Sequence, residues 1–110
     1  MGTLSPYGMA RQLEIDVMRI LAAVDVTALD VKAAKLVAEI KQQVVDARLD
    51  IRDWEMSETR QEQLQNERIA SKRLEDLRRD ILAASEYNIF SAVDVAQLTA
   101  RIDSIAEQLE

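Results

Sequence analysis

Three aspartates are regularly spaced in a stretch of helix-forming residues near the middle of the chain. Asp46, Asp50 and Asp53 stand four and three residues apart, which would place them on one side of a helix. Carboxylate oxygens gathered in this way are ligands for Mg²⁺ or Ca²⁺. Arg48 and Arg52 lie beside them and would neutralise part of the charge. A solvated acidic face without a metal is the interpretation we adopt.

A group of cations occupies the second half of the chain and could grip a phosphate or an acidic partner. Its members are Arg68, Lys72, Arg73, Arg78 and Arg79. The acids interspersed among them are Glu67, Glu75, Asp76 and Asp80. The mixture predicts a surface covered by ion pairs. Arg78 and Arg79 remain candidates for contact with a protein partner.

The few aromatic residues offer two further candidates. Trp54 either contacts a partner, since tryptophan is enriched at interface hot spots, or ends an internal apolar stripe. Tyr87, Ile89 and Phe90 form a cluster before the last predicted helix and are expected to lie across from Tyr7. This cluster could line a pocket for a ligand or plug the end of a helical bundle.

Residue types that commonly carry catalysis are scarce. The sequence has no histidine and no cysteine, which removes the commonest general base, the commonest transition-metal ligand and the thiol nucleophile. We find no phosphate-binding glycine loop or nucleophile elbow. These observations predict a protein that is not an enzyme and that holds no metal and no cofactor.

The charge balance narrows the classes of partner. The chain carries 14 basic and 20 acidic residues, for a net charge of −6. Binding to nucleic acid or to an anionic membrane depends on basic surface, so both are disfavoured. No apolar run approaches the roughly 18 residues that span a bilayer. We therefore expect a soluble cytoplasmic protein without membrane insertion.

Helix is the expected structure of nearly the whole chain, because neither proline nor glycine occurs from Met9 to Glu110. A length of 110 residues suits one all-α domain, 1–110. Capping residues Ser5, Thr27, Thr59 and Ser91 mark helix starts. The predicted helices cover about 6–23, 27–57, 60–85 and 92–109, in the order short, long, long, short.

The polar stretch at 57–68 leaves two arrangements open. The chain either turns near Ser57–Thr59 to form an antiparallel hairpin, or continues as one helix over 27–85. We favour the turn, which makes the polar stretch a solvated tip. With it, the four helices form an antiparallel arrangement with coiled-coil character.

Apolar residues recur at steps of three and four along the predicted helices. We call this set the seam; its members are Leu36, Ile40, Val44, Ile51, Leu74, Leu77, Ile81, Leu98, Ile102 and Ile105. An elongated chain of this size buries less surface than a compact one. The seam therefore predicts self-association, with a homodimer favoured.

Leu98-Thr99-Ala100-Arg101-Ile102-Asp103 resembles a short motif in a known family. The small sporulation-type aspartyl-phosphate phosphatases of bacteria are two-helix hairpins whose second helix carries serine, glutamine, any residue, leucine and aspartate. Residues 69–110 are similar to such a hairpin. Thr99, Ala100 and Ile102 depart from the motif, and Asp103 matches its aspartate. The resemblance implies Asp103 as the active residue and a response-regulator receiver domain as the partner.

A non-enzymatic helical module for protein–protein interaction is the function we predict, on the basis of the regular seam. An adaptor, a chaperone, a regulator and an assembly component all fit, and the partner is an unidentified protein. The alternative is regulation of a receiver domain through Asp103. The second alternative, association with nucleic acid, would use the cations of the third predicted helix.

Overall fold

The computed structural model describes residues 4–109, and within them the fold is all-α without strands. Its elements are α1 (Pro6–Ala22), the short 3₁₀ helix η1 (Val26–Ala28), α2 (Val31–Glu55), α3 (Arg60–Ser85) and α4 (Ala92–Leu109). The four α-helices have 17, 25, 26 and 18 residues, which is the predicted order of lengths.

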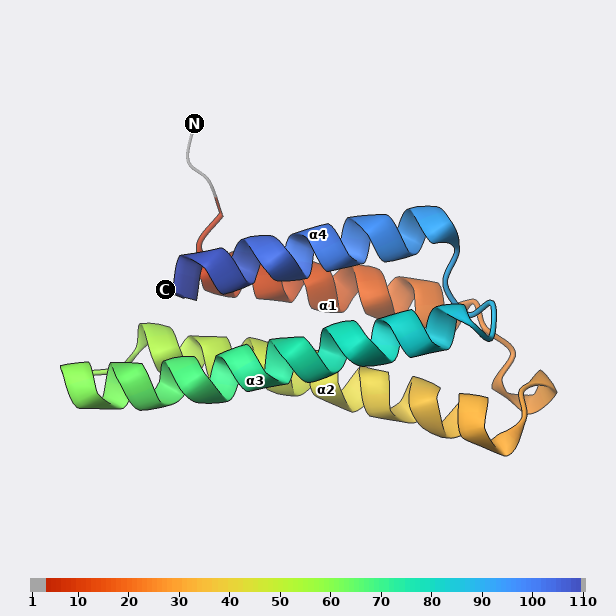
Figure 1. The fold of residues 1–110 in the computed structure, drawn as a ribbon, viewed down its shortest axis with the longest axis horizontal. Helices are drawn as coiled ribbons and strands as arrows, with labels where there is room; N and C mark the ends of the chain where they lie inside the picture. The colour runs from red at the N-terminus through yellow and green to blue at the C-terminus, as the bar shows by residue number, and fades with distance from the viewer. Residues whose placement is uncertain (1–3, 110) are drawn as a thin grey trace.

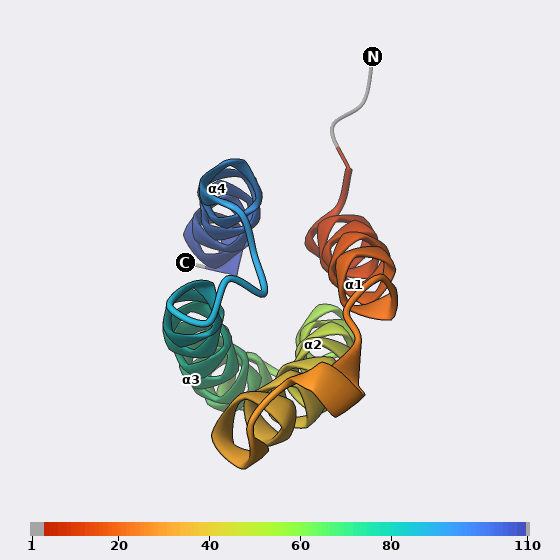
Figure 2. The same cartoon turned by 90° about the vertical axis from the view of Figure 1, so that its right-hand side faces the viewer.

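The helices form an antiparallel four-helix arrangement in which consecutive helices pack side by side and α4 returns to α1 (Figures 1 and 2). Each helix therefore has two neighbours, and the apolar side chains meet inside the ring. The molecule measures 47 × 31 × 17 Å along its principal axes. The long axis reflects the α2–α3 hairpin, which extends past the C-terminal end of α4 (Figure 1).

Side-chain caps begin three of the four α-helices as predicted. The Ser5 hydroxyl oxygen accepts from the Gly8 N–H at 3.0 Å, and that of Thr59 accepts from the Glu62 N–H at 3.1 Å. Ser91 and Asp94 satisfy each other's N–H groups, at 3.0 and 3.4 Å. These bonds satisfy N–H groups that have no acceptor within their helix.

The predicted start of α2 at Thr27 is wrong by four residues. The N-cap is Asp30, whose Oδ1 accepts from the Ala33 N–H at 2.8 Å. Thr27 instead lies in η1, and its N–H donates to Asp25 Oδ1 at 3.1 Å. Val26 and Val31, the apolar residues that would pack together around a cap at Thr27, are 39% and 84% exposed.

The chain turns between Met56 and Thr59, so the hairpin forms and a continuous helix over 27–85 does not. Asn66 fastens the turn, because its Nδ2 donates to the Ser57 hydroxyl at 2.9 Å and to the Asp53 carbonyl at 3.3 Å. The polar residues of the stretch 57–68 are thereby held at the hairpin tip.

Nearly all of the seam lies in the core of a single chain. Nine of its ten members are at most 3% exposed, and Leu36 is the exception. Leu36 packs against the edge of the core. Val37, which is 2% exposed, takes the interior position that was expected for Leu36. The side chains expected to join two chains are thus already covered within one.

The α3–α4 connection closes one end of the bundle. Asn88 adopts a φ of 60°, the left-handed conformation that glycine, or less often asparagine, takes after a helix. Ile89 and Phe90, 7% and 2% exposed, pack into the core as a plug. Tyr7 does not lie across from them: its N–H donates to Glu55 Oε1 at 3.1 Å at the opposite end of α1.

Candidate functional site

The three aspartates of α2 serve in ion pairs with arginines. Arg73 of α3 places its Nε 3.0 Å from Asp50 Oδ2 and its Nη1 3.8 Å from Asp46 Oδ2. Asp53 pairs with Arg52 at 3.7 Å. Within residues 4–109 no group of three acids is arranged to hold a metal ion. Arg73 is the partner that sequence spacing does not reveal, because it comes from the neighbouring helix.

Four cations of α3 likewise have acidic partners, namely Lys72, Arg73, Arg78 and Arg79. Arg68 forms no ion pair within residues 4–109. Lys72 Nζ lies 3.1 Å from Asp76 Oδ1, and Arg78 Nε lies 3.2 Å from Asp103 Oδ1. Arg79 reaches both Asp76 and Asp80 at 3.5 Å. The arginine side chains at 78 and 79 remain exposed on the outer face of α3. Their predicted contact with a partner stays a prediction.

The ion pair between Lys72 and Asp76 lowers the pKa of the Asp76 carboxyl group. The hydrogen bond from Lys72 holds the pKa of Asp76 below its ordinary value of 3.8, with further charge stabilisation from Lys72, Arg79 and Arg73. The ionised carboxylate stabilises the fold above that ordinary pKa, and this contribution is lost as pH falls through the lower folded-state pKa.

We predict that Lys72→Gln raises the pKa of Asp76, because the carboxylate loses its hydrogen-bond donor and a neighbouring positive charge. Carbon NMR of the carboxyl group measures this pKa. An unchanged pKa would contradict the pairing; Lys35→Gln, on α2, is the control.

Asp103 lies on the exposed face of α4, where its side chain is 55% exposed and paired with Arg78. The ion pair links α4 to α3, which gives the aspartate a surface role that requires no substrate. The action on a receiver domain that the motif implies stays a prediction.

Trp54 combines features of both of its predicted roles. The side chain is half-buried and packs against the core from the C-terminal turn of α2. Its Nε1 is buried and has no hydrogen-bond partner among residues 4–109. The indole thus contributes to packing at the hairpin end of the bundle, and its contact with a partner stays a prediction.

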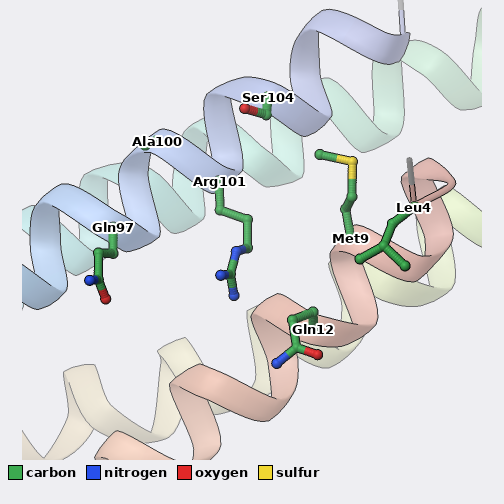
Figure 3. A pocket seen from close by; sticks show the side chains of 7 residues that line it. All are labelled: Leu4, Met9, Gln12, Gln97, Ala100, Arg101 and Ser104. Atoms are coloured by element: carbon green, nitrogen blue, oxygen red, sulfur yellow. The ribbon is translucent and has the colours of Figure 1, made fainter. Parts of the chain in front are cut away.

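A groove of about 550 Å³ separates α1 from α4; we call it the side groove (Figure 3). Its lining residues are Leu4, Met9, Gln12, Gln97, Ala100, Arg101 and Ser104. Arg101 reaches from α4 towards α1, where it pairs with Asp16. Gln12 and Arg19 also donate to Asp16 Oδ1, at 3.1 and 3.2 Å. The charges of this groove are therefore matched within the chain.

A second groove, of about 580 Å³, lies where the α1–α2 and α3–α4 connections converge; we call it the end groove. Its lining residues are Ile20, Ala23, Val24, Asp25, Ala28, Leu29, Tyr87, Asn88, Ile89 and Asp94. Figure 2 looks onto this end and shows both connections facing the reader. The lining is mostly apolar, and the Tyr87 residue is 38% exposed. The predicted cluster at 87–90 is thus divided: Phe90 belongs to the plug, Tyr87 faces the groove, and Ile89 contributes to both.

Comparisons with models of protein families, with curated proteins and with solved structures each returned no match. Among residues 4–109, no helix has the length and apolar character needed to cross a membrane.

Proposed function

We propose that this chain is a non-enzymatic helical module that binds another protein at the end groove. The observation that carries the proposal is an apolar groove on the outside of a bundle whose core is already closed. Ile20, Val24 and Leu29 contribute aliphatic surface, and Tyr87 contributes an amphipathic ring. Concave apolar surface with a few polar groups is the usual character of a binding site.

The backbone around the groove is held in place on both sides. Asn88 fixes the α3–α4 connection, and the reciprocal bonds of Ser91 and Asp94 fix the start of α4. Asp25 caps η1 on the other side. Because the connections are fastened before a partner arrives, binding would cost less ordering entropy than on a flexible loop.

An adaptor, a chaperone, a regulator and an assembly component would each use such a surface. Self-association, with a dimer favoured, stays part of the proposal. Two copies would have to meet through residues on the outside of the bundle, because the seam is buried within each chain. Association with nucleic acid gains no support, since most cations of α3 are paired with acids. The net charge of −6 also opposes it.

Site-specific photocrosslinking in host cells tests the proposal. A photoreactive phenylalanine analogue replaces Tyr87 in one variant and Leu82 in the control; these residues are 38% and 40% exposed. We expect a discrete protein adduct from position 87 and none from position 82. Absence of an adduct at 87, or equal adducts at both positions, would overturn the proposal. An adduct with a second copy of the chain would identify the end groove as the dimer surface.

A further inference from the structure

Among residues 4–109, those that line the end groove include two carboxylates and no cation. Asp25 and Asp94 belong to its lining, which contains no lysine or arginine. Neither carboxylate forms an ion pair with any Lys or Arg of residues 4–109. The groove therefore has two carboxylates without a direct ion pair beside apolar surface. Asp94 also lines a neighbouring pocket with Arg19 and Arg101, both of which pair with Asp16.

Local hydrogen bonds hold both carboxylates in place and use one oxygen of each. Asp25 Oδ1 accepts from the Thr27 N–H at 3.1 Å and from its hydroxyl at 2.6 Å. Asp94 Oδ2 accepts from the Ser91 N–H at 3.4 Å. The second oxygen of each aspartate has no hydrogen-bond donor among residues 4–109. Each can thus accept a bond from a bound cation without losing its capping bond.

We infer that the end groove takes a basic, apolar segment of a partner protein, an inference that rests on the proposed function. An aliphatic or aromatic side chain of the segment would be buried against Ile20, Val24 and Leu29. A lysine or arginine beside it would meet Asp25 or Asp94. The same carboxylates would repel an acidic segment, so the pair of charges selects among partners as well as attracting them.

The side groove differs from the end groove in that its charged residue already has a partner within the chain. The charged residue in the side-groove lining given above is Arg101, which pairs with Asp16 of its own chain. A ligand would gain charge pairing with Arg101 only by displacing Asp16. At the end groove the charge pairing is still to be made, and a basic partner supplies it.

Selection from a phage-displayed library of random short peptides tests this inference on the intact chain. We expect the retained peptides to combine an apolar residue with a neighbouring Lys or Arg. Asp25→Asn and Asp94→Asn should each weaken a selected peptide about twofold to fivefold, the range for an exposed ion pair. Asparagine keeps an oxygen for the capping bonds, so the fold is preserved. Glu75→Gln, which removes an exposed charge of α3 instead, should leave the affinity unchanged.

The outcomes separate the inference from the proposed function. NMR shift changes on peptide addition locate the binding surface. Peptides that bind at the end groove without excess Lys or Arg, and equally to both Asn variants, would overturn the inference and leave the proposed function standing. Equal weakening by Glu75→Gln would also overturn it, because general charge would then be the cause. Absence of any peptide bound at the end groove would overturn both.

Discussion

Replacement of Leu77 with alanine is expected to lower the free energy of unfolding by about 2–5 kcal/mol. Leu77 lies on the core face of α3 and is 0% exposed. Truncation removes buried apolar surface and leaves a cavity that the surrounding helices can fill only in part. Native domains are stable by only about 5–15 kcal/mol, so the variant should unfold at a much lower urea concentration.

Leu82 provides the matched control, because the same substitution on the same helix removes a side chain that is 40% exposed. We expect Leu82→Ala to change stability by no more than about 0.5 kcal/mol. Circular dichroism during urea titration measures both variants. Losses of equal size would mean that the interior of the ring is not the principal core, and the observed packing would then be wrong.

Helix starts show what local sequence determines. Ser5, Thr59 and Ser91 each cap the helix that their position predicts. Thr27 fails because two other capping side chains, Asp25 and Asp30, stand within three residues of it. Intrinsic N-cap preference ranks aspartate above threonine, but it does not choose between Asp25 and Asp30. The path of the connection between α1 and α2 decides which N–H each oxygen reaches.

The choice between Leu36 and Val37 shows a second limit. Both are apolar, and either continues a stripe of three- and four-residue steps from Ala33 to Ile40. The interior takes Val37, while Ala33 and Ile40 on either side of it are buried as the stripe requires, so only this one position changes. How α2 packs against its neighbours selects Val37 over Leu36, and the pattern along a single helix cannot make that choice.

Long-range polar contacts depend on the register between helices. Arg73 meets Asp50, and Arg48 meets Glu14 at 2.6 Å, over separations of 23 and 34 residues. Each residue is recognisable as a charged position, but its partner is not. The end groove likewise depends on contacts between segments that are far apart in the sequence. Tyr87 and Ile89 are candidates from sequence, whereas Asp25 and Leu29 join them only when two connections meet.

The contact between Gln43 and Asp80 is a partly buried polar pair between α2 and α3. Asp80 is 9% exposed, and its Oδ2 accepts from Gln43 Nε2 at 2.8 Å. Gln43 Oε1 is buried and has no hydrogen-bond partner among residues 4–109. A pair of this kind costs desolvation energy and fixes the register of the two helices, because sliding by one turn would separate its members.

A double-mutant cycle on this pair should show strong coupling. Gln43→Leu alone is expected to cost about 1–3 kcal/mol, because the buried carboxylate loses its amide donor. Adding Asp80→Leu should recover most of that loss, since replacing both polar groups by apolar ones can be nearly neutral. Urea unfolding of the four proteins yields the coupling energy, which we expect to exceed about 1 kcal/mol. Additive losses would contradict a direct contact.

Asp80→Asn keeps an acceptor for Gln43 but removes the charge, and it should cost less stability than Gln43→Leu. The comparison distinguishes the contribution of the hydrogen bond from that of the negative charge.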